Sequence, residues 1–382
     1  MPKAMRTIYQ RGYVSRRGCD RLNQVLGACA ELYNAELETW REQYKQAGGS
    51  DSLFDRFKAF TLFRNADEFW RNMSVHVGRG VLHRADRAKG SFYRRTKRGE
   101  NPGYPRFKPR NRFRTLQLEQ VTPAMVGPDR RGYVVRAKGL PVIRLRTKRE
   151  LPPSEELKSL RITFKGRRVG VSLVYAVDLE PLPHSPSRVG LDMGVMSRIT
   201  TSDGEKIERR RPDREQIARK QRRMTACKKN SRRYRKRRRI LANAHAKSRV
   251  RDRGRCHEIT TNLVRRHGFI ALEDLSVRQM IKSGGARKAG LNRSINEQSW
   301  RRIRDQLVYK AASAGRKLAF VDPRDTSQLC SDCGARAKKS LKERMHSCGC
   351  GLVLDRDHNA AINILKKALG GGTIPPAVGE TA

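Results

Sequence analysis

Three acidic residues stand where short apolar segments end or where a helix is expected to begin. Asp192 ends an apolar run that starts at Val189, and Glu273 ends one that starts at Phe269, and both runs are typical of strands. Asp357 begins a segment, residues 357–365, that we predict to be helical. Hydrolysis of a phosphodiester with two Mg²⁺ ions requires carboxylates from separate elements, because the ions stabilise the attacking water and the leaving oxygen. We therefore predict that Asp192, Glu273 and Asp357 bind Mg²⁺ and catalyse such a reaction.

Each acid also has an ordinary alternative as a turn or capping residue, and only their combination favours a site. Asp274 and Asp355 compete with their neighbours for the same role. We prefer Asp357, because the apolar side chains of the predicted helix would face inward and direct Asp357 at the site. Asp355 is then explained as a turn residue or as an ion-pair partner of Arg356. His358 is expected to be structural or to face the substrate.

Glycines near the acids predict room for a ligand. Gly190 and Gly194 flank Asp192, and Gly268 precedes the second apolar run. Because glycine has no Cβ, we expect a phosphate backbone to approach the first strand closely.

Four cysteines form a pattern with the spacing of metal ligands. Cys330 and Cys333 are a C-x-x-C pair, and Cys348 and Cys350 are a tighter C-x-C pair, separated from the first by residues 334–347. Four thiolates close a tetrahedral Zn²⁺ site and leave no position for water, so the zinc is predicted to be structural and distinct from the hydrolytic metal. The alternatives are a site in which His346 replaces a thiolate and a degenerate ribbon without metal.

The charge of the chain predicts a polyanionic partner. Its 382 residues contain 85 Lys and Arg against 37 Asp and Glu, a formal net charge of +48. Nucleic acid is the natural candidate, because each phosphate contact releases condensed counterions. A membrane surface is the weaker alternative, since no run approaches the roughly 18 apolar residues of a spanning helix. The N-terminus also lacks the apolar core of a signal peptide, so we expect a cytoplasmic, nucleoid-associated protein.

The densest basic segment lies between the two predicted catalytic strands, in residues 208–255. A segment this rich in basic residues could be a solvated face or a disordered basic tail. We favour a helical arm that grips phosphates. The predicted nucleic-acid contacts are Arg232, Arg233, Arg235, Lys236, Arg237 and Arg238.

The remaining patterns divide the chain into helical and strand-rich regions. Apolar residues at helical spacing predict a long helix over 19–46, and more helix is expected over 55–93. The aromatic residues of this region, such as Phe54, Phe63 and Trp70, are expected in its core. Strands are predicted around 5–15, 133–135, 142–145, 161–164 and 169–177, in a small antiparallel barrel or sheet.

These motifs resemble those of the TnpB family of insertion-sequence transposons, from which the type V CRISPR effectors descend. Residues 190–195, 272–275 and 355–364 look like the three motifs of the family's RuvC nuclease domain, 325–334 is similar to the start of its zinc ribbon, and 22–34 and 103–107 also look familial. The resemblance spans nearly the whole chain. The C-x-C pair departs from the commoner C-x-x-C of the family.

The resemblance implies an α+β multidomain protein. Its parts would be an RNase H-like (RuvC) α/β nuclease domain with an inserted zinc ribbon, a β-barrel wedge domain and a helical recognition lobe. Carried onto this chain, they are the first wedge strand (1–18), the helical lobe (19–100), the wedge barrel (101–182), the nuclease domain with its basic arm (183–324), the zinc ribbon (325–352), the end of the nuclease domain (353–369) and a flexible tail (370–382).

The resemblance also implies a function. It predicts an RNA-guided endonuclease that binds a guide RNA transcribed from the transposon end and cleaves double-stranded DNA beside a short target-adjacent motif. We expect a protein that is monomeric within its ribonucleoprotein and has no membrane partner. The alternatives are an RNA-guided DNA-binding repressor whose nuclease has decayed, which the presence of all three acids disfavours, and a transposase that transfers strands itself.

Overall fold

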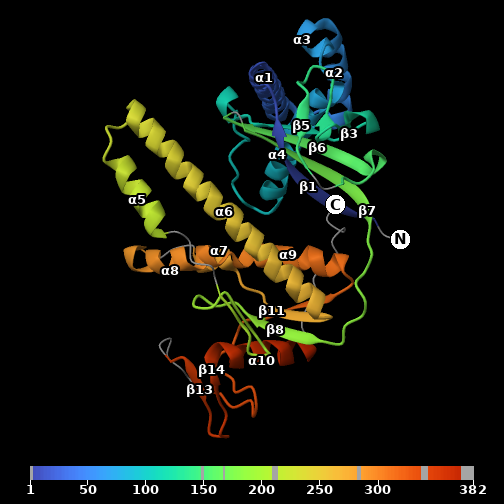
Figure 1. Ribbon diagram of the computed structural model, residues 1–382. Helices are drawn as coiled ribbons and strands as arrows, with labels where there is room; N and C mark the ends of the chain where they lie inside the picture. Colours follow the sequence, from blue (N-terminus) through green and yellow to red (C-terminus); the bar gives the residue numbers. More distant parts are fainter. Residues whose placement is uncertain are drawn as a thin grey trace. The chain divides into compact units, whose positions relative to one another are not determined.

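The computed structural model describes residues 3–147, 150–166, 168–208, 214–281, 285–336 and 343–370. The chain divides into two units, Met1–Leu179 and Glu180–Ala382, each with its own core. The mixture of helices and sheets agrees with the predicted α+β class (Figure 1). The finer division into seven segments stays a prediction, and the predicted flexible tail lies outside the described residues from 371 onward.

The helices of the first unit begin with a long, capped one. α1 (Arg16–Ala47) confirms the helix predicted over 19–46. Ser15 caps it, because the Ser15 hydroxyl accepts a hydrogen bond of 3.0 Å from the backbone N–H of Gly18. Gly48 ends it with φ 64°, a left-handed conformation that glycine adopts at little cost. α2 (Leu53–Ala66), α3 (Glu68–Arg71) and α4 (Val75–Lys97) follow.

A seven-stranded antiparallel sheet makes up the rest of the first unit, in the order β2-β6-β7-β1-β5-β4-β3. Its strands are β1 (Lys3–Tyr13), β2 (Thr115–Leu118), β3 (Val126–Asp129), β4 (Gly132–Val135), β5 (Ile143–Leu145), β6 (Leu157–Lys165) and β7 (Arg168–Asp178). The first strand of the chain lies centrally, paired with β7 from Lys3 opposite Asp178 to Gly12 opposite Val169. β2 and β3, which our sequence analysis missed, form the two edges, and among the described residues no ladder joins them into a closed barrel.

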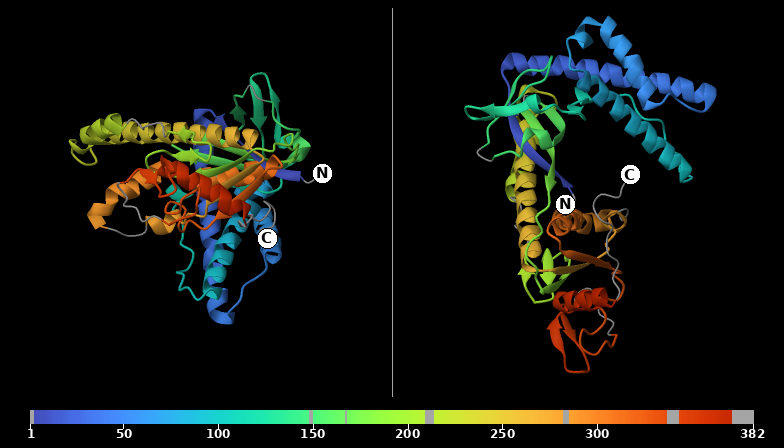
Figure 2. Two further views of the ribbon diagram at one scale, coloured as in Figure 1. Left: turned by 90° about the horizontal axis from the view of Figure 1, so that it is seen from below. Right: turned by 90° about the vertical axis from the view of Figure 1, so that its right-hand side faces the viewer.

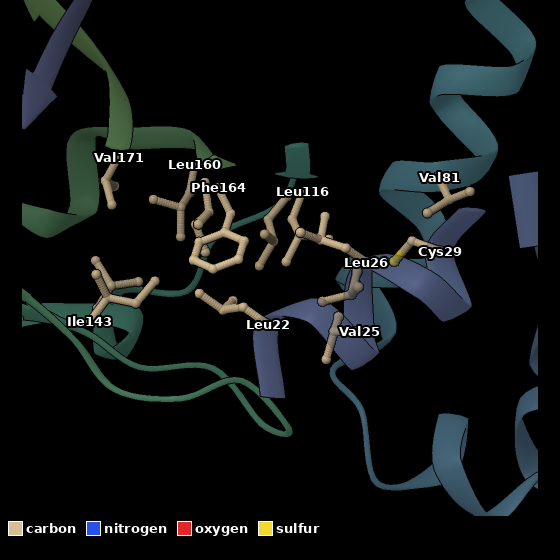
Figure 3. Close-up of a cluster of buried hydrophobic side chains, with 14 of the residues drawn as sticks. Leu22, Val25, Leu26, Cys29, Val81, Leu116, Ile143, Leu160, Phe164 and Val171 are labelled. Carbon is tan, nitrogen blue, oxygen red and sulfur yellow. The ribbon is translucent and has the colours of Figure 1, made fainter. Parts of the chain in front are cut away.

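The core of this unit lies between α1 and the sheet (Figure 3). Leu22 and Leu26 of α1 pack toward Leu160 and Phe164 of β6, as the alternating burial of β6 requires. The prediction of an aromatic core is right for Trp70, which is buried, but wrong for Phe54 and Phe63. These two phenylalanines are 66% and 47% exposed, because they lie on the outer side of α2.

The second unit contains a five-stranded mixed sheet in the order β10-β9-β8-β11-β12. Its strands are β8 (Arg188–Asp192), β9 (Ile199–Thr201), β10 (Lys206–Ile207), β11 (Phe269–Glu273) and β12 (Lys317–Val321). β11 runs parallel to both β8 and β12. β11 is almost entirely buried, as expected for a parallel strand covered on both faces.

Helices cover both faces of this sheet (Figures 1 and 2). The helices are α5 (Arg214–Thr225), α6 (Arg232–Arg266), α7 (Val277–Met280), α8 (Gly285–Gln298), α9 (Trp300–Ser313) and α10 (Arg356–Leu369). α6 and α9 pack on one face and α10 on the other. A two-stranded ribbon, β13 (Met345–Ser347) and β14 (Val353–Asp355), directly precedes α10. Among the described residues, no helix is long and apolar enough to cross a membrane.

A buried ion pair joins the loop before β9 to α6 and α9. The side chain of Arg198 is only 1% exposed, and its guanidinium lies 2.6 Å from a carboxylate oxygen of Asp252. The other oxygen of Asp252 accepts hydrogen bonds of 2.7 Å from Ser299 and from Arg302. Burial alone would raise the pKa of Asp252, but the hydrogen bonds from Arg198 and Ser299 and the nearby positive charges lower it overall.

Candidate active site and metal-binding cluster

Two of the predicted acids lie side by side at the carboxyl-terminal ends of two neighbouring strands, β8 and β11. The parallel register pairs Leu191 of β8 with Leu272 of β11, so Asp192 and Glu273 occupy the next positions on adjacent strands. Side chains alternate along a strand, and Ala271 contributes to the core beneath α10. Glu273, two residues further on, therefore points to the α10 face.

Asp192 is directed to the same face by its neighbour Gly190. A Cβ on Gly190 would lie 2.1 Å from the carbonyl oxygen of Ala361, which shows that α10 packs directly on this part of β8. Asp192 has the same parity as Gly190 and so shares the α10 face. The room at Gly190 is thus filled by α10 and not by a phosphate backbone, which corrects our sequence-based expectation. Gly268 is also filled from within the protein, since a Cβ there would lie 1.9 Å from the carbonyl oxygen of Ser185.

The third acid, Asp357, lies in the first turn of α10. One of its carboxylate oxygens is 3.6 Å from the position that a Cβ on Gly194 would take, two residues after Asp192. Gly194 is therefore the glycine that lies beside the acids. The packing of α10 on β8 brings an acid from the last element of the chain to two acids on the sheet.

The acids influence one another electrostatically. Burial and the negative charges of Glu273 and Asp357 raise the pKa of Asp192 well above its ordinary value. Burial and the charge of Asp355 raise the pKa of Asp357. Asp192 is partly buried and Glu273 is 7% exposed, so water screens this repulsion poorly. A bound cation would relieve it, which is the property expected of a site for a hard divalent metal.

Glu273 is held by a residue that our sequence analysis did not single out. The Thr326 hydroxyl donates a hydrogen bond of 2.5 Å to Oε1 of Glu273. Burial raises the pKa of Glu273, while this hydrogen bond and the charge of Lys367 oppose the rise. Thr326 lies 53 positions further along the chain. No local sequence signal marks such a pairing.

The two competing acids are occupied elsewhere. Asp355 is the N-cap of α10, and its Oδ1 accepts hydrogen bonds from the backbone N–H groups of Asp357 (3.0 Å) and His358 (3.2 Å). Its Oδ2 lies 2.7 Å from the ammonium of Lys206, which is a different partner from the Arg356 we had considered. Asp274 lies 2.6 Å from a guanidinium nitrogen of Arg304.

His358 has a structural contact. Its Nε2 lies 3.0 Å from the carbonyl oxygen of Ser202, in the turn that follows β9. A Cβ on Gly204 of the same turn would lie 3.2 Å from the imidazole ring. The histidine therefore packs α10 against this turn, in agreement with the structural alternative.

The four cysteines form a compact cluster that could hold a metal ion, with all four sulfur atoms within 4.8 Å of one another. Cys330 Sγ lies 3.7 Å from Cys350 Sγ, and Cys333 Sγ lies 3.5 Å from Cys348 Sγ. A tetrahedral zinc ion with Zn–S bonds of about 2.3 Å requires sulfur separations of about 3.8 Å, so the set fits Zn²⁺ despite the short C-x-C spacing.

His346 is not part of this cluster. Its side chain is completely buried on β13, and neither ring nitrogen has a hydrogen-bond partner among the described residues. The acidic side chains are less tightly grouped than the thiols. Within the described ranges, the cysteines are the one set of three or more candidate ligands that come this close together.

α10 connects the cysteine cluster to the acids. The buried Asn359 accepts a hydrogen bond of 2.9 Å from the backbone N–H of Ser331 and donates one of 2.8 Å to the carbonyl of Leu329. Asn363 donates to the carbonyls of Leu329 and Thr326, at 2.8 and 2.9 Å. The helix that carries Asp357 thus holds the segment on both sides of Cys330.

The predicted basic contacts lie on the first turns of α6. α5 and α6 pack against each other as two successive helices, so most of the described part of the basic segment is helical (Figure 1). Of the six predicted side chains, five are exposed and Arg237 is partly buried. None of the six forms an ion pair with an acid among the described residues, which leaves their charges available to an external polyanion.

Two known families match parts of the chain that lie almost entirely in the second unit. A family described as "Probable transposase" matches residues 172–284, and one described as "Cas12f1-like, TNB domain" matches residues 300–364. The first match contains two of the acids, and the second contains Asp357 and all four clustered cysteines.

Curated proteins resemble the chain over most of its length. A "Putative RNA-guided DNA endonuclease" of Streptomyces pristinaespiralis is 32% identical over 381 residues, which cover 97% of this chain and 90% of the relative. "Putative RNA-guided DNA endonuclease InsQ" of Escherichia coli K12 is 28% identical over 377 residues, which cover 94% and 90%.

A solved structure has a similar fold. A Cas12f1–sgRNA–target DNA complex, studied by cryo-electron microscopy, contains a chain that matches with a TM-score of 0.62 and 11% identity. The match covers 95% of this chain and 98% of that one. At this identity the likeness concerns the fold alone.

Proposed function

The chain belongs to the TnpB family, and from this premise we propose that it is an RNA-guided DNA endonuclease. It binds a guide RNA derived from the transposon and cleaves double-stranded DNA next to a short target-adjacent motif. The observation that carries the proposal is the meeting of Asp192, Glu273 and Asp357 on one face of the mixed sheet. Relatives of similar length that are named as RNA-guided DNA endonucleases support it.

The acids fit Mg²⁺, because their oxygens are hard ligands and their mutual repulsion favours a divalent cation. Bound there, Mg²⁺ supplies charge stabilisation for the attacking water and the leaving oxygen of an in-line displacement. Asp192, Glu273 and Asp357 would hold it. Thr326 keeps the Glu273 carboxylate oriented, and Asp355 fixes the first turn of α10 and with it Asp357.

Zinc in the cysteine cluster has a separate, structural role. Four thiolates complete its coordination, so no position is left for water. The ion would hold the segment around Cys330, which Asn359 and Asn363 bind to α10. We therefore assign the cluster to the family's zinc ribbon and the mixed sheet with its acids to an RNase H-like nuclease domain.

The first unit then corresponds to the wedge domain and the helical recognition lobe. In support, α1 to α4 lie between β1 and β2 in the chain, so the helices interrupt the sequence of one sheet. The net charge of +48 suits a protein that holds a folded RNA and a heteroduplex through their backbones. The basic start of α6 is one place where such a backbone would bind, within a ribonucleoprotein that contains one copy of the chain.

The first experiment identifies the RNA that binds the protein. The protein is purified from cells that carry its native locus, washed at high salt, and the retained RNA is sequenced. One defined RNA with a constant scaffold and an end in flanking sequence is expected, and the complex should then cleave matching duplex DNA in Mg²⁺. A heterogeneous mixture of cellular RNA would contradict the guided function.

The variant Asp192→Asn tests the site. It should retain the RNA but lose cleavage by about 100-fold or more, since it removes a metal ligand. Asp305→Asn is the matched control, because Asp305 is exposed on α9 and forms only a surface ion pair. Unchanged cleavage by Asp192→Asn would refute the site. Target binding without cleavage by the wild type would favour a repressor, and joined products would favour strand transfer.

A further inference from the structure

A basic hollow in the first unit has no role in the site described above. Its volume is about 360 Å³, and it lies between α4 and the edge of the seven-stranded sheet formed by β2 and β6. The residues that line it include Arg84, Arg87, Phe113, Gln117 and Arg161. Three arginines therefore surround one small space.

α4 reaches this edge because of one glycine. A Cβ on Gly80 would lie 1.7 Å from the backbone carbonyl oxygen of Gln117, so only glycine permits this approach of the helix to β2. Arg84 and Arg87 follow at four and seven positions after Gly80 and thus lie on the same side of the helix. The close contact at Gly80 directs both arginines at the edge of the sheet.

The sheet presents polar side chains to these arginines. The register pairs Thr115 with Thr163 and Gln117 with Arg161. The residues that alternate with them on both strands are buried in the core, so these four side chains share the opposite face. Arg161 donates a hydrogen bond of 3.1 Å to the side-chain oxygen of Gln117.

The positive charge of the hollow is incompletely compensated. Arg87 lies 2.8 Å from Glu119, but Arg84 and Arg161 have no carboxylate partner among the described residues. The guanidinium carbon of Arg84 lies 4.4 Å from the centre of the Phe113 ring, which holds it in place. Burial lowers the pKa of Arg84, and the charges of Arg87 and Arg161 add to this effect. An anion is therefore the natural ligand.

We propose that this hollow binds a backbone phosphate of a nucleic acid, with Arg84 and Arg161 as its principal donors. Guanidinium groups match the geometry of phosphate oxygens, and the hydroxyls of Thr115 and Thr163 provide further donors on the same face. The proposed function is needed only to name the nucleic acid, which is either the guide RNA or the target DNA. Because a phosphate contact carries no sequence information, the site itself is independent of guidance.

The test compares Arg161→Gln and Arg84→Gln with Lys158→Gln. Lys158 is exposed on the same strand but does not line the hollow, so its variant loses the same charge elsewhere. Arg161 is also exposed, so replacing it should leave the fold intact, and thermal unfolding checks Arg84→Gln. Dissociation constants are measured against KCl concentration for full-length protein with the co-purifying RNA, and for the resulting complex with duplex DNA.

Binding is measured for RNA and for duplex DNA, and these are the two arms of the test. In one arm, Arg84→Gln and Arg161→Gln should each bind about 10-fold more weakly than Lys158→Gln. The slope of log K against log[KCl] should also fall by about 0.7–0.9 more than in that control. The affected arm identifies the nucleic acid. Equal behaviour of all three variants in both arms would overturn the proposal. If the co-purifying RNA is heterogeneous, a 40-nucleotide RNA of arbitrary sequence replaces it, so guidance can fail while the phosphate site is still tested.

Discussion

The Thr326 hydroxyl donates a hydrogen bond of 2.5 Å to Oε1 of Glu273. The threonine lies four residues before Cys330, and its own carbonyl accepts a hydrogen bond of 2.9 Å from Asn363 of α10. The carboxylate at the end of β11 is therefore oriented by the segment that leads into the cysteine cluster. This contact links one of the three acids to the segment that enters the proposed zinc ribbon.

Replacing Thr326 by valine should reduce cleavage by about 10- to 100-fold, because an acid that is predicted to bind metal loses the group that orients it. Thr326→Ser keeps the hydroxyl and should restore most of the rate. Single-turnover cleavage of matched DNA at saturating complex measures the effect. A valine variant as fast as wild type would show that this hydrogen bond is only structural.

The four thiolates should bind one Zn²⁺ per chain. Elemental analysis of purified protein is expected to find it, and Cys350→Ser should lose it because the tetrahedral set is then incomplete. Cys227→Ser is the control, since Cys227 lies outside the cluster and should retain full zinc. Retention of zinc by Cys350→Ser, together with loss by His346→Ala, would instead identify the histidine as a ligand.

A methyl side chain at position 190 should disturb the packing of α10 on β8. Gly190→Ala places a methyl group 2.1 Å from a backbone oxygen that cannot move alone, so we expect a loss of about 1–3 kcal/mol in the free energy of unfolding. Gly254→Ala is the control within α6, where a Cβ meets nothing within 4 Å. It should be neutral or stabilising by up to about 1 kcal/mol. Urea denaturation measures both, and equal stability of the two variants would argue against this packing.

Removing the partner of a buried guanidinium should be costly. Asp252→Asn leaves Arg198 without its carboxylate, and we expect a loss of about 3–5 kcal/mol in the free energy of unfolding. Asp305→Asn, which breaks an exposed pair with Arg301, should change it by less than about 1 kcal/mol. Chemical denaturation at neutral pH compares the two variants, and a loss as small as that of the control would mean that Arg198 finds another partner.

The same pair predicts a dependence on pH. The pKa of Asp252 is lower in the folded protein than in the unfolded chain, so its contribution to stability is complete above the unfolded value of about 3.9. It is lost as the pH falls through the lower, folded value. The stability difference between wild type and Asp252→Asn should therefore be constant above about pH 5 and shrink below about pH 4. A difference that persists unchanged at the lowest pH would exclude this carboxylate as its source.

The basic start of α6 should contribute to nucleic-acid affinity through charge. The double variant Arg235→Gln, Arg238→Gln should lower the salt slope of RNA or DNA binding by about 1.4–1.8, because two phosphate contacts are lost. Arg301→Gln, Lys317→Gln removes the same charge from other exposed positions and should change the slope less. Equal slopes for the two double variants would indicate an unspecific effect of net charge.

The sequence by itself determined those features that depend on neighbours along the chain. Helical spacing of apolar residues predicted α1, a short strand-like run predicted part of β6, alternation predicted β7, and two apolar runs predicted β8 and β11. Cysteine spacing identified the four side chains that the structure brings together. The short edge strands β2 and β3 were missed, because the alternation of β2 extends over only four residues and β3 contains Gly127 and Pro128, which are rare in strands.

Only the tertiary structure decided which residues meet across long separations. The sequence already favoured Asp357 over Asp355, but only the structure shows that Asp355 caps α10 and pairs with Lys206. It reveals Thr326 as the partner of Glu273 and shows that Gly190 makes room for α10. These relationships depend on strand register and on the approach of one backbone to another. Both are set by the packing of the whole sheet and leave no mark in local sequence.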